Sequence, residues 1–150
     1  MDRINRVIFV AGSGTTRAPM ATAIFLATPR KRQFTAEARG LIVQFPEPLN
    51  QKAEAVLISN GIELKDYQSK KLMESDFTED TLVIAMEETQ RQKILADYSA
   101  ATEENTRLLN ELVGDELEIM DPYGGSVQTY GLCYEVLKVS IEKLMRVLDA

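Results

Sequence analysis

The chain has 150 residues, of which 45% are hydrophobic, so it is long enough to bury a core without disulfide bonds. Cys133 is its only cysteine, which excludes an internal disulfide and favours a reducing, cytoplasmic location. A net charge of −6 disfavours a broad nucleic-acid surface. The sequence contains no histidine, which removes serine–histidine and cysteine–histidine pairs and most zinc sites. We therefore expect neither a metal nor another cofactor.

Membrane association is not expected either. The longest apolar runs, such as Val7–Val10 and Thr81–Ala85, are far too short to cross a bilayer, and no signal-peptide pattern precedes the first strand. The basic run Arg30–Arg32 follows an expected helix end, where cations are favoured by the helix dipole. We interpret this run as a helix-end feature and not as a binding patch.

Strand-like and helix-like segments alternate along the chain. Strands are predicted at Arg6–Val10, Phe34–Ala38, Thr81–Ala85 and, more weakly, Thr106–Leu109; helices are predicted from Pro19 to before Pro29 and at Leu49–Asn60, Glu87–Asp97 and Val127–Leu148. The last helix has the clearest pattern, with steps of three and four along one apolar face: Val127, Tyr130, Tyr134, Leu137, Ile141, Leu144 and Leu148. Cys133 lies beside this face and is expected to be inert core.

Alternation of this kind predicts right-handed crossovers and a parallel sheet. The fold class we predict is a single three-layer α/β domain over residues 1–150, with a four-stranded parallel sheet and helices on both faces. Ligands bind beyond the carboxyl ends of the strands in such sheets, and the loop Ala11–Arg17 lies there.

That loop, within "VIFVAGSGTTRAPM", has the composition of an anion-binding nest. Gly12 and Gly14 allow positive φ, the following helix adds its positive end, and Arg17 offers a planar fork for two phosphate oxygens. Hydroxyl groups come from Ser13, Thr15 and Thr16. The alternative is an ordinary strand-to-helix turn in which Arg17 points to water.

Two other glycine-loop motifs are excluded, each by a single residue. A P-loop requires a lysine that this loop lacks. A dinucleotide fingerprint requires a third small residue where "GSGTTR" has Arg17.

The sequence resembles the low-molecular-weight protein tyrosine phosphatase family over nearly its whole length. The family's loop has the form C-x5-R-[ST]-P-M-A, and "AGSGTTRAPMA" fits that frame at Arg17, Pro19, Met20 and Ala21. A second family motif, D-P-[YF] before the last helix, matches "DPYGGS" at Asp121, Pro122 and Tyr123. Gly40, "GIEL" at 61–64 and "DTLVIAM" at 80–86 also fit. The resemblance implies the same fold and a phosphotyrosyl ligand.

The resemblance also implies a role for each matched position. The family's cysteine attacks phosphorus, its arginine clamps the equatorial oxygens and its aspartate protonates the leaving group. Here Arg17 would be the clamp, Asp121 the general acid, and Tyr123 with Phe45 the wall beside an aromatic substrate. The phosphate-binding residues would be Gly12, Ser13, Gly14, Thr15, Thr16, Arg17 and Ala18. The nucleophile's position is Ala11, which has no lone pair.

Other loop positions depart from the family pattern together with Ala11. Gly14 replaces an asparagine common in the family, Thr16 replaces a second cysteine, and Ala18 replaces the hydroxyl residue that assists the thiolate. A laboratory trapping variant would change the cysteine alone, so the joint loss favours a natural change.

Three functions follow from these observations. The first is a protein that binds phosphate or a phosphotyrosyl group, as on a phosphorylated protein, with impaired catalysis. The second is an active phosphatase, seen as a trapping variant or using a non-standard mechanism. The third is a partner-binding regulator that uses the surface around Phe45 and Tyr123 without phosphate. Asp121 has an alternative role as a turn or helix-cap residue, and we expect Glu87, Glu88, Glu103 and Glu104 to be solvated.

Overall fold

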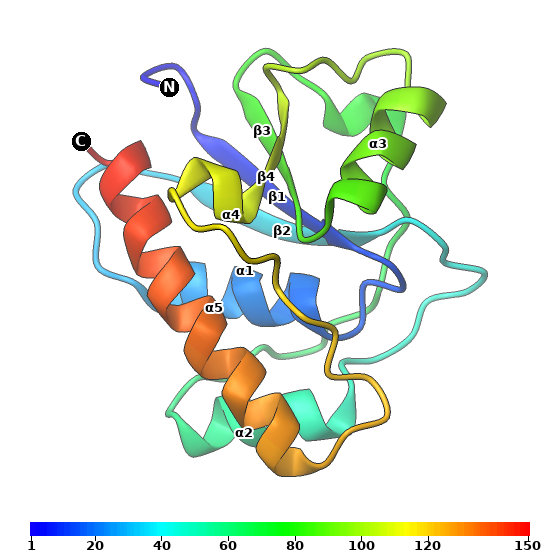
Figure 1. Ribbon diagram of the computed structural model, residues 1–150, viewed down its shortest axis with the longest axis vertical. Helices are drawn as coiled ribbons and strands as arrows, with labels where there is room; N and C mark the ends of the chain where they lie inside the picture. Colours follow the sequence, from blue (N-terminus) through cyan, green and yellow to red (C-terminus); the bar gives the residue numbers. More distant parts are fainter.

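Four parallel strands form the centre of the computed structural model, which describes residues 1–150 (Figure 1). The elements in chain order are β1 (Arg6–Ala11), α1 (Arg17–Ala27), β2 (Thr35–Gly40), α2 (Gln51–Ser59), the 3-10 helix η1 (Glu74–Asp76), β3 (Thr81–Ala85), α3 (Glu88–Asp97), β4 (Thr106–Leu108), α4 (Leu109–Leu112) and α5 (Val127–Leu148). The strand order is β2-β1-β3-β4, and every pair is parallel. The predicted four-stranded parallel sheet is therefore confirmed.

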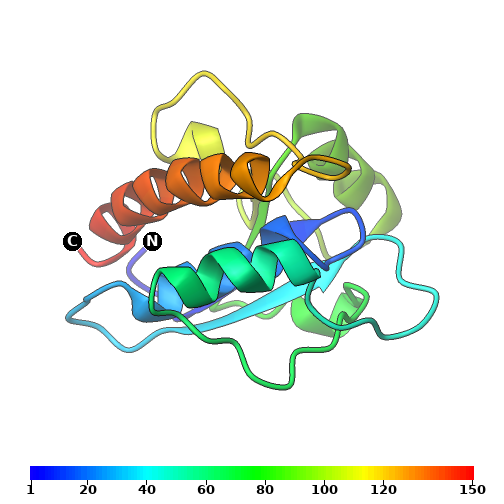
Figure 2. The same cartoon turned by 90° about the horizontal axis from the view of Figure 1, so that it is seen from below.

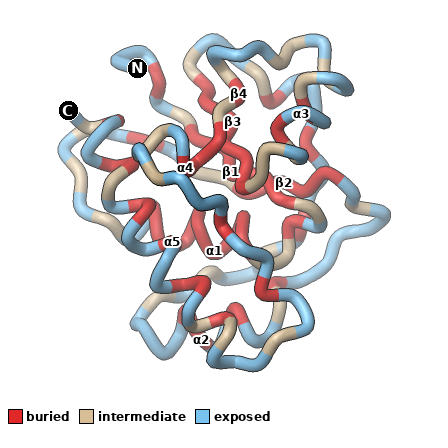
Figure 3. Tube along the Cα trace, in the orientation of Figure 1, coloured by how far each residue is buried: buried red, intermediate tan, exposed pale blue.

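Helices cover both faces of the sheet. α1 and α5 lie on one face, α2 runs alongside α5 (Figure 2), and α3 packs against β3 and β4. Side chains alternate along β1, so that Val7 and Phe9 join the core under α1 and α5, whereas Ile8 and Val10 join a smaller core with Ile94 of α3. The buried residues consequently concentrate in the strands and in α1 (Figure 3).

The last helix has the predicted bounds and most of the predicted core face. Six of its seven face residues, from Tyr130 to Leu148, are buried, which confirms the apolar pattern. Val127 is an exception at 47% exposure, because the loop before it is itself exposed and gives it no cover. Cys133 is buried, as expected.

Strand β2 extends two residues beyond the predicted Ala38, because Arg39 is buried and neutralised there. Arg39 Nε donates to Asp76 Oδ2 at 3.1 Å, and Asp76 also accepts the Met73 N–H at 2.9 Å. Burial by itself would raise the pKa of Asp76. The hydrogen bonds from Arg39 and Met73 and the charges of Arg39 and Arg6 outweigh burial, so the pKa lies below its usual value. Ion pairing between distant segments thus allows a charged residue to continue the strand.

The remaining bounds differ from prediction by one or two residues at most, apart from η1 and α4, neither of which was predicted. α2 begins after Asn50, whose Oδ1 accepts the N–H groups of Lys52 and Ala53 and caps the helix. The Arg30 guanidinium donates to carbonyls at the end of α1, which confirms its interpretation as a helix-end residue. No helix is both long and apolar enough to span a membrane.

Candidate active site

The loop Gly12–Thr16 joins the carboxyl end of β1 to the start of α1 and is held in place from two sides. Gly14 has φ +73°, a left-handed conformation that glycine adopts without strain. Tyr67 Oη donates to the Gly14 carbonyl at 2.5 Å, and burial raises the pKa of Tyr67 to about 12, so this donor keeps its proton. On the other side, Gly40 approaches so closely that a methyl group on it would lie 2.7 Å from the Ser13 carbonyl.

The backbone N–H groups of this loop and of the first turn of α1 have no acceptor in the protein. From Ser13 to Ala18, consecutive N–H groups donate to neither a backbone nor a side-chain oxygen, and Thr16 at the N-cap supplies no side-chain cap. Free N–H groups at a helix N-terminus, together with the helix dipole, favour an anion. The N–H groups that the predicted anion nest would use are therefore free of acceptors within the protein.

Arg17 is buried and held by its Nη1 atom. Nη1 donates to the Ile119 carbonyl at 2.7 Å and lies 2.6 Å from Glu87 Oε2, while the side chain is only 4% exposed. Nη2 lies 3.8 Å from Asp121 Oδ2, and neither Nη2 nor Nε donates a hydrogen bond within the protein. Arg17 thus does not point to water. Glu87 was expected to be solvated, and this expectation is wrong because Glu87 is the ion-pair partner of the buried guanidinium.

Asp121 lies at the mouth of the site, in the loop before α5. Its Oδ1 accepts the N–H of Tyr123 at 3.1 Å, and its side chain is about half exposed. This contact is the turn-forming role weighed for Asp121. The helix-cap role is wrong, since Ser126 Oγ accepts the Thr129 N–H and caps α5. One carboxylate oxygen of Asp121 consequently faces Arg17 while the other supports the turn.

These residues enclose a hollow of about 490 Å³ at the carboxyl end of the sheet. Its lining is Ala11, Gly12, Ser13, Gly14, Thr15, Thr16, Arg17, Glu47, Asn50, Asp121 and Tyr123. Ala18 is fully buried and contributes only its N–H. Phe45, predicted to form a wall, is 63% exposed and does not line the hollow, whereas Glu47 and Asn50 do.

Pattern reading missed Glu47 and Asn50 because they belong to an irregular loop, where no periodicity sets the direction of a side chain. For Asn50 a usable signal existed, since asparagine before a helical pattern is a common N-cap. The Asn50 N–H also donates to the Thr15 carbonyl at 2.9 Å, so the start of α2 supports the anion loop.

The remaining candidate nucleophile in the chain, Cys133, is not in the hollow. It is buried on α5, its Sγ lies 3.8 Å from the Met120 carbonyl oxygen, and burial raises its pKa to about 11. The thiol is therefore protonated at neutral pH. Nowhere do three acidic, cysteine or histidine side chains gather as metal ligands would.

Known proteins match this chain over nearly its whole length. Residues 6–150 match the model of a family described as low molecular weight phosphotyrosine protein phosphatase. A curated relative, the low molecular weight protein-tyrosine-phosphatase PtpB of Staphylococcus haemolyticus, is 29% identical over 141 residues, which cover 93% of this chain and 96% of the relative.

Solved structures agree with this match. The low molecular weight protein tyrosine phosphatase from T. tengcongensis is 30% identical and superposes with a TM-score of 0.86, covering 96% of this chain and 99% of its own. A YwlE arginine phosphatase, in a cysteine-to-serine form with a phosphorylated active-site serine, is 25% identical with a TM-score of 0.84, covering 94% of this chain and 93% of its own.

Proposed function

We propose a phosphate-binding function for this chain, which belongs to the low molecular weight phosphotyrosine protein phosphatase family. The loop at residues 11–18 binds a phosphate dianion or a phosphotyrosyl group, and the chain does not turn this ligand over by the covalent route. The single observation that carries the proposal is the row of acceptor-free N–H groups from Ser13 to Ala18, closed by Arg17.

Arg17 is suited to bind a phosphate because Nη1 is the only atom of its guanidinium that donates a hydrogen bond within the protein. Ile119 and Glu87 hold Nη1, which fixes the plane of the fork and leaves Nε and Nη2 available. A planar fork fixed in advance loses little entropy when it binds two phosphate oxygens. Tyr123 is 79% exposed at the mouth of the hollow, where it offers a face to an aromatic group on the phosphate.

The covalent route needs a lone pair at the position of Ala11. In the family mechanism a phosphorus–sulfur bond forms while the bond to the leaving oxygen breaks, and a methyl group can do neither. Removal of a covalent nucleophile commonly lowers turnover by several orders of magnitude. The hydroxyls of Ser13 and Thr15 are hydrogen-bonded to each other at 2.7 Å, and the chain has no histidine to activate them.

The same methyl group favours tight binding. A thiolate about 4 Å from a bound phosphate would raise the energy of the complex by up to about 4 kcal/mol for each negative charge on the phosphate, at an effective dielectric near 20. Ala11 removes this repulsion while Arg17 and the N–H groups remain. Because the bound phosphate would not be cleaved, the partner that we propose is a phosphorylated protein that stays bound. We also propose a reducing, cytoplasmic location, where the unpaired Cys133 stays reduced.

Isothermal titration calorimetry with inorganic phosphate tests the proposal. Wild type should bind, and Arg17→Ala should bind about 10- to 100-fold more weakly, because charged hydrogen bonds contribute about 1.5–3 kcal/mol. Arg107→Ala, on β4 outside the hollow, is the matched control and should bind as wild type does. Absence of heat from wild type would overturn the proposal. Competition between phosphotyrosine and phosphoarginine then distinguishes the ligand classes named by the relatives.

Turnover of para-nitrophenyl phosphate tests the impaired chemistry. Wild type should show none above background, so measurable turnover that depends on Arg17 would contradict the proposal and favour the active-enzyme alternative. Full activity in Ala11→Cys would indicate a site otherwise ready for catalysis. We expect full activity to require Ala18→Ser in addition to Ala11→Cys, because Ala18 also lacks the hydroxyl group that assists the family's thiolate.

A further inference from the structure

A second, larger hollow is lined by the segment that ends at Met120, whereas the next residue, Asp121, lines the phosphate hollow. This α5 groove, of about 700 Å³, is formed between α5 and the extended segment that follows α4. Its lining is Gly114, Asp115, Glu116, Leu117, Glu118, Ile119, Met120, Leu132, Cys133, Val136 and Ser140. None of these residues lines the phosphate hollow, so the groove is a separate feature.

The walls of the α5 groove carry large apolar side chains that the fold leaves exposed. Leu117 is 83% exposed, Met120 69%, Leu132 65% and Val136 51%. Val139, also 51% exposed, continues the row along α5 at the spacing i, i+4, i+7 from Leu132. Single exposed apolar residues are common, but a contiguous group beside a groove marks an interaction site. α5 therefore has a second apolar stripe, separate from the one that packs on α1 and α2.

Carboxylates border this stripe. Asp115, Glu116 and Glu118 line the groove; Asp115 pairs with Lys143 at 2.8 Å, and Glu118 accepts the Glu88 N–H at 2.6 Å. Glu116 is exposed and has no cationic partner.

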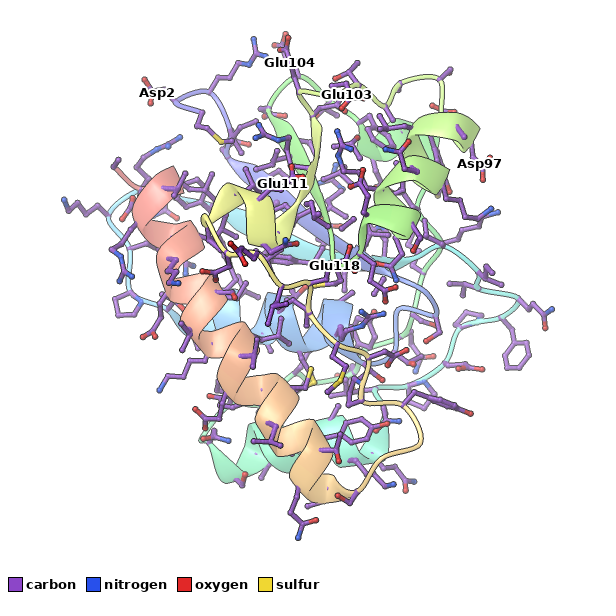
Figure 4. The ribbon with its side chains drawn as sticks, viewed as in Figure 1. Asp2, Asp97, Glu103, Glu104, Glu111 and Glu118 are labelled. Atoms are coloured by element: carbon purple, nitrogen blue, oxygen red, sulfur yellow. The ribbon has the colours of Figure 1, made fainter.

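Further acidic side chains extend this negative border. Figure 4 places Glu111 on α4 and Glu118 on the segment after it, next to α5. On the other side of the stripe, the helical period places Glu135 about 40° from Val139. The lining contains no lysine or arginine, and Lys143 is paired with Asp115, so the border is negative overall.

We propose that the α5 groove docks a positively charged amphipathic helix of a partner protein. Such a helix presents apolar side chains at i, i+3, i+4 and i+7, which match the spacing of the α5 stripe, and it places lysine or arginine against the carboxylates. A second copy of this chain is disfavoured, because the acidic border would face itself and the chain already carries a net charge of −6. The inference does not depend on phosphate binding.

Docking at the α5 groove could also affect the phosphate site, because one short segment, at Ile119, contacts both. Ile119 is one of the residues that line the groove, and its carbonyl accepts the hydrogen bond from Arg17 Nη1 at 2.7 Å. A helix that displaces this segment would change the position of the guanidinium. Phosphate affinity measured with and without the bound helix reports this link separately from docking itself.

The test measures fluorescence anisotropy of a labelled leucine–lysine peptide of about five helical turns, with leucines at i, i+3, i+4 and i+7. Wild type should bind this peptide, and it should bind neither the scrambled peptide of equal composition nor a leucine–glutamate version. Val136→Glu should weaken binding by about tenfold or more, because it places a carboxylate in the apolar contact. Ile58→Glu, at an exposed aliphatic residue on α2 outside the groove, should bind as wild type does.

Charge is tested in the same assay. Glu116→Lys should weaken binding several-fold at low salt and less at high salt, because salt screens the lost attraction. Glu104→Lys, outside the groove, should leave binding unchanged at both salt concentrations. Equal binding of the scrambled peptide, or equal affinities of the Val136 and Ile58 variants, would overturn the proposal. Sedimentation of wild type and Val136→Glu tests whether a second copy of the chain occupies the groove. A wild-type dimer that the substitution dissociates would assign the groove to that second copy and refute the proposal of a basic partner helix.

Discussion

Gly40→Ala tests whether phosphate binding depends on the path of the loop, because β2 and the loop approach each other most closely there. A methyl group on Gly40 would lie 2.7 Å from the carbonyl carbon and oxygen of Ser13 and 2.7 Å from Val43 Cγ2. Ordinary contact begins at 3.4 Å, so the Ser13 backbone must move by about 0.7 Å to accommodate it. That backbone carries the first of the free N–H donors.

Two measurements report this displacement. Overpacking should lower the free energy of unfolding, measured by urea denaturation, by about 1–3 kcal/mol. Loss of one charged hydrogen bond should weaken phosphate binding, measured by calorimetry, by about tenfold or more. Gly131→Ala is the control: it lies in α5 with no atom within 4 Å of the added methyl, so it should stabilise the helix by up to about 1 kcal/mol and leave phosphate affinity unchanged. If Gly40→Ala matched wild type in both measurements, close approach of β2 would not determine the loop's path.

Further outcomes are expected at three other residues. Asp76→Asn should lower stability by about 3–5 kcal/mol at neutral pH, because the buried Arg39 and the partly buried Arg6 lose their shared carboxylate. Since the folded pKa of Asp76 is lowered, its contribution is present above about pH 4 and is lost as pH falls through the folded value. Wild type should therefore lose stability more steeply in acid than the variant, as pH-dependent urea denaturation would reveal. Asp121→Asn should bind phosphate about three- to tenfold more tightly by calorimetry, because one negative charge leaves the mouth of the hollow; weaker binding would show that Asp121 supports the loop. Tyr67→Phe should lower the free energy of unfolding by about 1 kcal/mol, because it loses the bond to the Gly14 carbonyl. Unchanged stability in that variant would mean that the bond contributes nothing to the fold.

Much of the site could be predicted because its central part is local in the chain. Gly12 to Arg17 are consecutive residues between a strand and a helix, so the glycines and the arginine of the motif can be recognised from their spacing alone. Asp121 and Tyr123 were found through the second family motif, and both line the hollow. Phe45, predicted as part of the wall beside the substrate, does not line the hollow, because the direction of a side chain in an irregular loop depends on contacts that no periodic pattern encodes.

The sequence by itself determined the order of strands and helices, the buried face of α5 and the place of the glycine loop between β1 and α1, because each depends on spacing within a few residues. Only the tertiary structure decided that Glu87 pairs with Arg17, that Asp76 neutralises Arg39 within β2, and that the outer stripe of α5 borders a groove. These features join segments that lie tens of residues apart. A side chain's charge partner and cover depend on which segment is folded against it, and local propensity carries no information about that choice.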